Sequence, residues 1–258
     1  MSTLENAVAI LRCFTTERTE LGVSRVSQDL GVAKSTVSRL MKQMAELGLL
    51  ARDAESRRYR AGYLMFQLGS LYQADLRIFD LVDECVLRLV AATGHTGFIG
   101  VLDKGDLVSL RTHQGAHPVR YVLETGRRFP AFAASLGKAL LARLSDDDVR
   151  AFYPQRLESE FLPNPFTLDE LIAELAVIRE CGWADAQVGS IPGARAVGVA
   201  IGGAGRQQAI GFSLSYREAS VTGLQREQIL ATILGAARDI GIRTGDPHWV
   251  GEWKLRAI

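Results

Sequence analysis

The stretch 22–48 constrains the fold more than any other part of the chain. It reads GVSRVSQDLGVAKSTVSRLMKQMAELG, in which two short runs with apolar residues at helical spacing are separated by a turn at Gly31. Ser24 stands at an N-cap position of the first run, and Gly48 follows the second run as a C-terminal stop. Two helices joined in this way form a helix-turn-helix. The apolar residues predicted to form one stripe of the second helix are Val37, Leu40, Met41, Met44 and Leu47.

The face of the second helix opposite that stripe carries short polar and basic side chains. Short hydroxyl side chains let a backbone approach base edges and phosphates, and the helix N-terminus favours an anionic oxygen. Arg39 can bind a guanine through two hydrogen bonds, and Lys34 and Lys42 can neutralise phosphates. The alternative is an ordinary amphipathic helix hairpin whose polar face is only solvated. The residues expected to contact DNA in this stretch are Ser24, Lys34, Ser35, Thr36, Ser38, Arg39 and Lys42.

A third helix is predicted ahead of this motif, over residues 4–14, and closes a small core. Ser2 and Glu5 have the spacing of a capping box. The residues expected on the apolar side of the helix are Leu4, Ala7, Val8, Leu11 and Phe14. The first 60 residues carry ten Lys and Arg against seven Asp and Glu, whereas the remaining residues carry twenty against twenty-two. A basic small domain beside a slightly acidic larger one indicates that the first part contacts nucleic acid.

A β-hairpin is predicted directly after the helix-turn-helix. Its strands are expected at 49–52 and 57–61, with the tip at 53–56. A hairpin in this position is a wing, which can bind phosphates or the minor groove, and the alternative for its arginines is a solvated turn. The wing residues expected to contact DNA are Arg57, Arg58 and Arg60.

The length and composition are those of a globular protein with two domains. At 258 residues the chain is long enough for two, and no apolar run approaches the roughly 20 residues of a membrane helix. The start, MSTLENAVAILRC, lacks the basic n-region of a signal peptide, so we expect a cytoplasmic protein that binds no membrane. Cys13, Cys85 and Cys181 are odd in number and far apart, which argues against disulfides or a zinc site and favours buried thiols.

The rest of the chain predicts a connecting helix followed by an α+β domain. An apolar helix over 63–74 is expected to pack on a partner, and a second helix follows over 79–92. Strand patterns then alternate with capped helices, which predicts an antiparallel sheet of five or six strands. The predicted strands are 96–102, 107–112, 119–123, 183–187, 195–201 and 209–215, the further helices are 135–144, one starting at 145, 167–181 and 222–240, and the last sixteen residues show no strong pattern.

Several short motifs together resemble the IclR family of bacterial transcriptional regulators, over essentially the whole of residues 3–240. The N-terminal part of the resemblance is LENAVAIL, then LGVAKSTVSRLMKQMAELGLL and YRAG. The C-terminal part is more specific, and each motif alone is weak, but their order and spacing together are a strong signal. These motifs are GRRFP at 126–130, SLGKALLA at 135–142, GWA at 182–184, PGAR at 192–195 and SLS at 213–215.

The resemblance implies an α+β fold in which a winged helix-turn-helix domain is joined by a connecting helix to a GAF-like effector-binding domain with an antiparallel sheet. The implied partners are a palindromic double-stranded DNA operator, a small organic acid effector and further copies of the chain in a homodimer or dimer of dimers. The implied function is a transcriptional regulator switched by a small metabolite, with no cofactor, no metal and no catalytic activity. The corresponding domains are 1–62, 63–76 and 77–242, followed by a C-terminal tail at 243–258.

The resemblance also implies where an effector binds. The pocket would lie on one face of the sheet, where serine hydroxyls and backbone N–H groups at a helix start suit a carboxylate. Asp185 is the one acid in a segment that is more acidic in many family members, and Ala196 stands where a cysteine is frequent, so this pocket is less polar on one side. Phe98, Tyr121 and Trp183 either form an aromatic wall or belong to the core. The expected effector-binding residues are Phe98, Tyr121, Ser135, Leu136, Asp185, Ala196, Ser213 and Ser215.

Two other classes of function are weighed against a regulator. For an enzyme, a phosphate loop fails because Phe132 and Ala139 stand where the motif needs Gly and Ser or Thr, and no nucleophile elbow is present. The four histidines show no metal-ligand spacing, while a Ser213–His113 pair stays open. An RNA-binding module would carry exposed aromatics among basic residues on its strands, whereas the strands here are apolar and rich in glycine.

Overall fold

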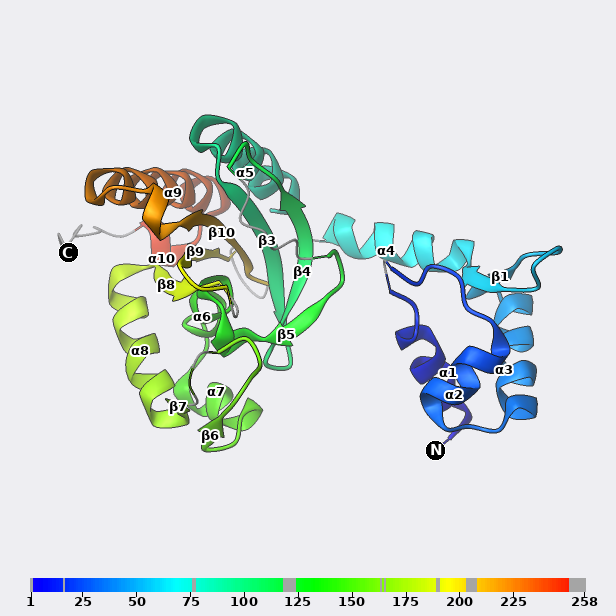
Figure 1. Cartoon of the computed structure of the whole chain (residues 1–258). Helices are drawn as coiled ribbons and strands as arrows, with labels where there is room; N and C mark the ends of the chain where they lie inside the picture. Colours follow the sequence, from blue (N-terminus) through cyan, green and yellow to red (C-terminus); the bar gives the residue numbers. More distant parts are fainter. Residues whose placement is uncertain are drawn as a thin grey trace. The chain divides into compact units, whose positions relative to one another are not determined.

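The structure is a computed structural model, and it describes residues 2–15, 17–75, 78–117, 124–162, 164, 166–188, 191–202 and 208–250 (Figure 1). It divides into two units, Met1–Arg77 and Ile78–Ile258. Each unit buries a hydrophobic core of its own.

The N-terminal unit combines three core helices, a short hairpin and one further helix. The first helix starts at the predicted capping box, in which the Glu5 N–H donates to the Ser2 hydroxyl at 3.2 Å and the Ser2 N–H donates to the Glu5 carboxylate at 2.6 Å. Gly31 has a φ of 63°, the left-handed conformation that ends the second helix and lets the third begin. The elements are α1 (Thr3–Arg12), α2 (Val23–Leu30), α3 (Lys34–Glu46), β1 (Leu50–Arg52), β2 (Tyr59–Ala61) and α4 (Tyr63–Asp75).

The predicted apolar stripe of α3 is buried, with one exception. Leu47 is 70 % exposed, so the prediction that it joins the core is wrong. The helix ends at Glu46, and the backbone leaves the helical conformation at Leu47, which turns that side chain away from the stripe. The confirmed members of the stripe, all in the core of this unit, are Val37, Leu40, Met41 and Met44.

One further prediction for this unit is wrong, and another is correct in part. The N-cap of α2 is Gly22 rather than Ser24, because the helix begins at Val23 and Ser24 lies within its first turn. Of the side chains predicted for the apolar side of the first helix, Ala7, Leu11 and Phe14 pack on the core, whereas Leu4 and Val8 are exposed, and the fully buried side chain of α1 is Ile10.

The predicted connecting helix is α4, which extends one residue beyond the predicted 63–74. Its large apolar side chains are exposed, and the rings of Tyr63 and Phe66 contact each other with 5.8 Å between their centroids. A run of exposed apolar groups is unusual on a free surface and marks an interaction site. The exposed members are Tyr63, Phe66, Leu68, Leu71 and Tyr72.

In the residues that the structure describes, the C-terminal unit is built on an antiparallel sheet of six strands in the order β5-β4-β3-β10-β9-β8. This confirms the predicted α+β class with an antiparallel sheet. The strand predicted over 119–123 lies outside the described residues, and β5 is a strand that the sequence did not predict. The sheet strands are β3 (Thr96–Asp103), β4 (Asp106–His113), β5 (Arg128–Pro130), β8 (Ala184–Gln187), β9 (Ala194–Ile201) and β10 (Ile210–Arg217).

Helices cover both faces of this sheet (Figure 1). On one face Gly97 leaves room for Val86 and Val90 of α5, and α9 packs beside α5. On the other face Gly211 leaves room for Leu136 and Leu140 of α6, and α8 packs on α6. The remaining elements are α5 (Phe79–Thr93), η1 (Ala131–Ala133), α6 (Ser135–Leu141), α7 (Asp146–Phe152), β6 (Arg156–Leu157), β7 (Phe166–Thr167), α8 (Leu168–Cys181), η2 (Glu218–Ser220), α9 (Gly223–Thr244) and α10 (Pro247–Val250).

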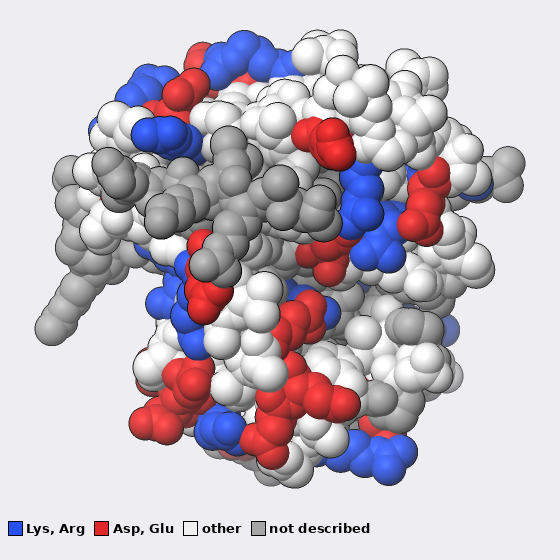
Figure 2. Space-filling view, turned by 90° about the vertical axis from the view of Figure 1, so that its left-hand side faces the viewer, with Lys and Arg blue, Asp and Glu red and all other residues white. Residues whose placement is uncertain are grey.

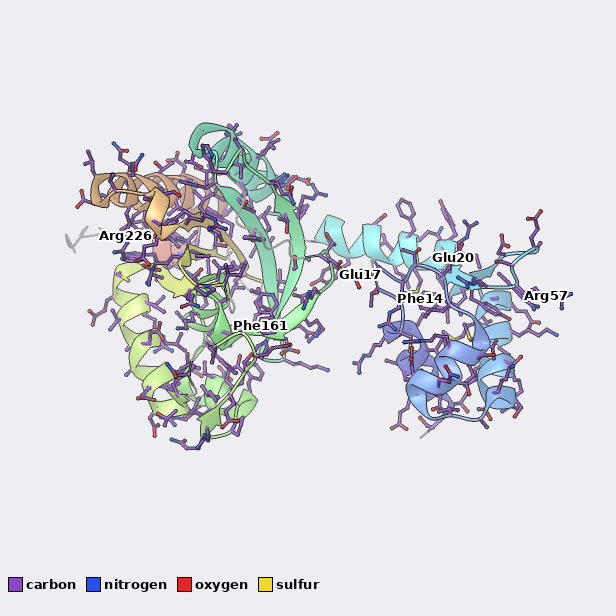
Figure 3. The ribbon with its side chains drawn as sticks, viewed as in Figure 1. Phe14, Glu17, Glu20, Arg57, Phe161 and Arg226 are labelled. Atoms are coloured by element: carbon purple, nitrogen blue, oxygen red, sulfur yellow. The ribbon has the colours of Figure 1, made fainter. Side chains whose placement is uncertain are left out.

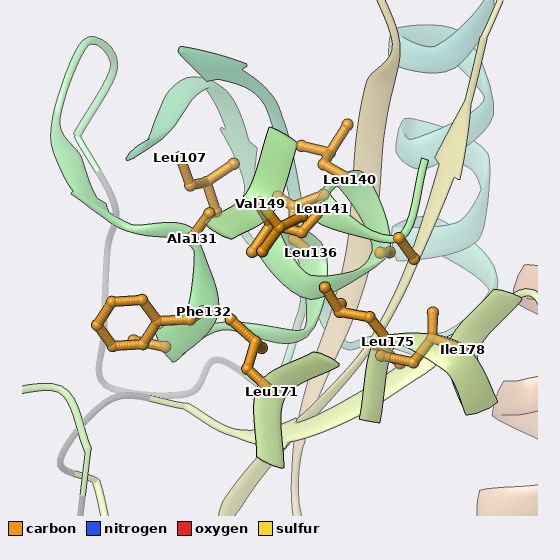
Figure 4. Close-up of a cluster of buried hydrophobic side chains, with 14 of the residues drawn as sticks. Leu107, Ala131, Phe132, Leu136, Leu140, Leu141, Val149, Leu171, Leu175 and Ile178 are labelled. Atoms are coloured by element: carbon orange, nitrogen blue, oxygen red, sulfur yellow. The ribbon is translucent and has the colours of Figure 1, made fainter. Parts of the chain in front are cut away.

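The core between the sheet and α6–α8 fixes the start of α6 against the sheet (Figure 4). Leu136 and Leu140 of α6 meet Leu171 and Leu175 of α8 in one cluster of buried side chains. Close approach of α6 depends on Gly198 of β9, where a Cβ would lie only 2.5 Å from the backbone nitrogen of Leu136. The first turn of α6 is therefore held directly over β9.

The end of the chain contains more structure than the sequence predicts. Residue 243 does not begin a separate tail, because α9 continues through it to Thr244 and α10 follows. Trp249 is buried against Gly241, and its indole N–H donates to the carbonyl oxygen of Ala200 at 2.9 Å. Residues 251–258 lie outside the described part of the chain.

Three predicted helix starts are confirmed, while the prediction for the cysteines is correct only in part. Ser145, Thr167 and Thr222 each accept a hydrogen bond from the backbone N–H three residues on, as N-caps do.

Cys85 is buried, but Cys13 and Cys181 are half-buried, and all are free thiols. Among the helices that the structure describes, none has the length and apolar character of a membrane span.

Candidate functional site

The polar face of α3 forms an exposed surface on the N-terminal unit. Lys34 is the first residue of the helix, and the apolar stripe holds the opposite face in the core. The ammonium of Lys42 lies 3.8 Å from the carboxylate of Glu46, an exposed pair that contributes little and leaves the lysine available to another anion. Thr36 is half-buried, and the predicted contact residues that are exposed are Ser24, Lys34, Ser35, Ser38, Arg39 and Lys42.

The wing is a short hairpin held at both ends. At its base, Leu21 and Tyr59 exchange two backbone hydrogen bonds of 2.9 Å, which fix β2 to the core. At its tip, the Asp53 carboxylate accepts hydrogen bonds from the Ser56 backbone N–H at 2.7 Å and the Ser56 hydroxyl at 2.8 Å, and these bonds lower the pKa of Asp53. Figure 3 shows the Arg57 side chain at this tip. The wing arginines Arg57, Arg58 and Arg60 are all exposed.

The C-terminal unit contains a pocket between its sheet and the start of α6. Its walls come from β3, β9 and β10 and from the first residues of α6, which Gly198 allows to sit close above the sheet. The pocket has a volume of about 40 Å³. Of the predicted effector-binding residues, it brings together Phe98, Ser135, Leu136, Ala196, Ser213 and Ser215.

The wall of this pocket includes a buried hydroxyl that forms no hydrogen bond with the described residues. The hydroxyl oxygen of Ser215 is buried and has no hydrogen-bond partner among the described residues, and the residue lines the pocket. Directly opposite Ser215 on β3 is Thr96, whose hydroxyl is also buried without a partner in the described part of the chain. Since side chains alternate along a strand, Ser213 points to the same face of the sheet as Ser215. The pocket therefore combines apolar walls with unused hydrogen-bonding capacity.

Asp185 does not line the pocket, and the prediction that places it there is wrong. Its carboxylate forms ion pairs with Arg195 at 2.9 Å and with Arg226 of α9 at 2.7 Å (Figure 3). Asp185 pairs with Val197 in the sheet, whereas its neighbour Ala186 pairs with the pocket residue Ala196. The alternation along β8 thus turns Asp185 to the face that α9 covers.

The geometry does not support the enzymatic alternatives. His113 does not meet Ser213, because its imidazole Nε2 lies 2.7 Å from the Asp83 carboxylate of α5 on the other face of the sheet. The ammonium of Lys138 lies 2.8 Å from both carboxylate oxygens of Glu174, which explains its place on α6 without a phosphate. No group of His, Cys, Asp and Glu suited to a metal occurs among the residues that the structure describes.

Two family models match the two units of the chain. Residues 71–242 match the model described as bacterial transcriptional regulator IclR C-terminal, and residues 3–54 match the IclR helix-turn-helix domain. The chain belongs to the IclR family. Proteins of this family are transcriptional regulators rather than enzymes. The two matches confirm, at the level of the family, the predicted helix-turn-helix domain and effector domain.

Curated relatives and solved structures agree with this membership. The regulator XynR of Escherichia coli is 27 % identical over 93 % of this chain and 98 % of that protein, and KdgR of Dickeya chrysanthemi is 25 % identical over 95 % and 80 %. An IclR regulator from a Silicibacter species aligns with a TM-score of 0.79 at 25 % identity, over 96 % of this chain and 99 % of the other. The IclR protein of Thermotoga maritima shares the fold, with a TM-score of 0.70 at 22 % identity over 94 % and 98 %.

For this IclR-family chain, the binding roles of individual residues remain predictions. Tyr121 lies outside the described residues, and Trp183 is half-buried and does not line the pocket. Sequence reasoning also missed pocket residues. Phe129 and Phe161 carry no local signal and reach the pocket only through the fold.

Charge on the two units agrees with a division of roles. On the face of the C-terminal unit that Figure 2 shows, acidic and basic side chains are interspersed. The excess of basic residues lies instead in residues 1–60. DNA is thus the partner of the N-terminal unit, and the pocket is the candidate effector site.

Proposed function

We propose that this regulator binds a small carboxylic acid in the pocket of its C-terminal unit and reads a palindromic operator as a dimer. Residues 1–62 would bind DNA, 63–76 would connect the domains and 77–242 would bind the effector. The helix α3 and the wing would contact the operator, and α4 would carry the response to the effector. Because its partner is operator DNA, the protein would act in the cytoplasm.

The buried hydroxyl of Ser215 carries the effector proposal. A buried donor without a partner costs about 1–3 kcal/mol, so a ligand oxygen that accepts from it gains that free energy on binding. A carboxylate offers two acceptor oxygens, which can be reached from Ser213 and Ser215 on one face of β10. The apolar walls, including Phe98 and Leu136, suit the hydrocarbon part of such an acid.

One relative provides a precedent for an acid. An IclR homologue from Microbacterium hydrocarbonoxydans, with a TM-score of 0.75 and 20 % identity over 93 % of this chain and 99 % of that one, was crystallised with 4-hydroxybenzoate. That ligand is an aromatic carboxylic acid bound by that protein. For this chain the carboxylate is inferred from the pocket residues themselves.

Thermal stability in the presence of small acids tests the effector proposal. Because ligand binding to the folded state raises the melting temperature, propionate should raise it in the wild type. Uncharged amides of the same size should raise it less. The double variant Ser213→Ala with Ser215→Ala should lose the response and keep operator binding, while the exposed Ser220→Ala is the matched control. An unchanged response in the double variant would place the effector elsewhere.

The exposed apolar side chains of α4 support the dimer. Such groups are stabilised when a second surface covers them. In a dimer, the two α3 helices must reach half-sites about 34 Å apart or a multiple of that spacing. Sedimentation of the wild type and of Phe66→Ser with Leu71→Ser tests this assembly. A wild-type protein that sediments as a monomer and binds a single half-site as tightly as a palindrome would contradict it.

A further inference from the structure

A second chamber lies beside the effector pocket. The pocket next to Ser213 and Ser215, here called the inner pocket, has a volume of about 40 Å³, which holds about three water molecules. The second space, here called the outer chamber, has a volume of about 250 Å³. Neither alone reaches the roughly 300–1,000 Å³ of a typical ligand site, whereas the two joined would approach the lower end of that range.

Three residues line both spaces and so form the wall between them: Ala133, Phe161 and Gln187. Phe161 has the largest side chain of the three, and it comes from the segment between β6 and β7, outside any helix or strand (Figure 3). Its ring packs on Phe129 with 5.7 Å between centroids, and the Arg127 guanidinium lies 6.0 Å from the ring centroid. The ring is therefore held in place, although it belongs to no regular element.

The outer chamber has a polar wall whose charges are already paired. The Lys138 ammonium lies 2.8 Å from both oxygens of the Glu174 carboxylate, and it is also 5.7 Å from the centroid of the Phe166 ring. The lysine is only 12 % exposed. A cation satisfied in this way gives little attraction to a second carboxylate. The outer chamber is suited to the hydrocarbon part of a ligand rather than to its acid group.

We propose that Phe161 determines the specificity of the site by limiting the effector to a small acid. This inference rests on the proposed function, since it takes the carboxylate to bind at Ser213 and Ser215. With the ring in place, only a short hydrocarbon part fits beside the serines. Removal of the ring joins the two spaces, and an acid with a bicyclic ring system then fits with its carboxylate at the serines and its rings across position 161.

Binding of a small and a large acid to two variants tests this role. The probes are propionate, 2-naphthoate and the uncharged 2-naphthol, and the affinities are measured by calorimetry. Phe161→Ala is expected to bind 2-naphthoate at least tenfold more tightly than the wild type and propionate within threefold. Phe161→Leu, which keeps an apolar side chain, should show a smaller gain and remains informative if Phe161→Ala does not fold. Phe152→Ala removes an exposed ring that lines neither space and is the matched control.

The outcomes separate the specificity proposal from the carboxylate proposal. A gain for 2-naphthoate in Phe161→Ala, with or without a gain for 2-naphthol and absent in Phe152→Ala, supports the role of Phe161. A gain for 2-naphthol alone, with no binding of either acid, supports Phe161 as the wall and overturns the carboxylate assignment. If the wild type binds 2-naphthoate as tightly as the variant, or neither Phe161 variant gains affinity for either large probe, Phe161 is not the limiting residue.

Discussion

The carboxylate of Asp246 is completely buried and pairs with the guanidinium of Arg143, with 2.6 Å between Oδ1 and Nη2. The same carboxylate accepts hydrogen bonds from the backbone N–H of Gly202 at 2.7 Å and of His248 at 3.0 Å. One side chain thus joins the segment after α6, the end of β9 and the start of α10. These segments are far apart in the sequence, so Asp246 fixes how the end of the chain closes on the sheet.

The first prediction follows from this pair. Asp246→Ala leaves the Arg143 cation and the Gly202 N–H without their partner, and loss of one member of a buried pair typically costs about 3–5 kcal/mol. Urea unfolding of the full chain should show that the free energy of unfolding of the C-terminal unit decreases by that amount. Arg156→Ala breaks an exposed pair with Glu158 and should change the free energy of unfolding by less than about 1 kcal/mol. Equal effects of the two substitutions would contradict the role of Asp246.

Local signals predicted most of the secondary structure, and they failed at helix boundaries that moved by one or two residues and at the short strand β5. The capping boxes at Ser2 and Thr167 start helices as predicted, because the side chain and backbone groups involved are neighbours in sequence. Leu47 was misplaced because α3 ends one residue before it, and Ser24 because α2 begins two residues earlier than predicted. The buried Asp246 gave no local signal, since its partners Arg143 and Gly202 are distant in the sequence.

The pocket shows the same division between local and long-range information. Ser213 and Ser215 could be assigned to one face because strand alternation depends only on sequence. The face of Asp185 depends on how β8 pairs with β9, and its ion pair with Arg226 requires a helix from elsewhere in the chain. Phe161 reaches the pocket from a segment without helix or strand periodicity. Residues of this kind are found only when the fold is known.

The second prediction concerns base recognition by α3. If Arg39 binds a guanine through two hydrogen bonds, Arg39→Ala should cost about 1–3 kcal/mol of operator affinity and relax the preference at one base pair. Lys34→Ala should weaken all sequences alike and reduce the salt dependence of binding, because a phosphate contact carries no sequence information. Titration of operator and mismatched duplexes at several salt concentrations measures both. The control is Arg88→Ala on α5, and two variants with wild-type affinity would refute the assignment.

The third prediction concerns the wing. Arg57→Ala with Arg58→Ala removes two exposed cations at the tip of the hairpin, so operator binding should weaken and become less sensitive to salt. The thermal response to effector should stay the same, because the pocket belongs to the other unit. Arg57 has a φ of 55°, and alanine at that position keeps the same backbone strain, so the change reports on charge. A lost effector response with normal DNA binding would show that the units are wrongly divided.

The fourth prediction concerns stability at mildly acidic pH. Burial lowers the pKa of His95, and the nearby His117 lowers it further. The unfolded chain then takes up a proton near the ordinary pKa of about 6.5, whereas the folded chain does so only at lower pH. The free energy of unfolding should keep its full value above that ordinary pKa and should decrease as the pH falls below it. Burial also lowers the pKa of His248, so the two histidines act in the same direction.

Unfolding in urea at pH 7.5 and pH 5.5 measures this dependence. His95→Gln should lose less stability between the two conditions than the wild type, because glutamine does not titrate. The lowered pKa values of Asp53 and Asp169 act at more acidic pH and do not explain a change in this interval. Equal losses in the wild type and His95→Gln would show that His95 does not contribute.

The last prediction concerns the cost of two buried hydroxyls without partners, one of which lines the pocket. Ser215 and Thr96 face each other across β10 and β3, and each hydroxyl is buried without a partner among the described residues. Replacing such a group by an apolar one of similar shape is neutral or stabilising, because no hydrogen bond is lost. Ser215→Ala should therefore raise the free energy of unfolding by up to about 1 kcal/mol, and Thr96→Val should behave alike. In the same proteins, Ser215→Ala should reduce the thermal response to propionate, so that stability and effector binding change in opposite directions. The exposed Ser220→Ala should change neither quantity. If Ser215→Ala instead destabilises the protein by more than about 1 kcal/mol, the Ser215 hydroxyl stabilises the folded protein and is not available to a ligand.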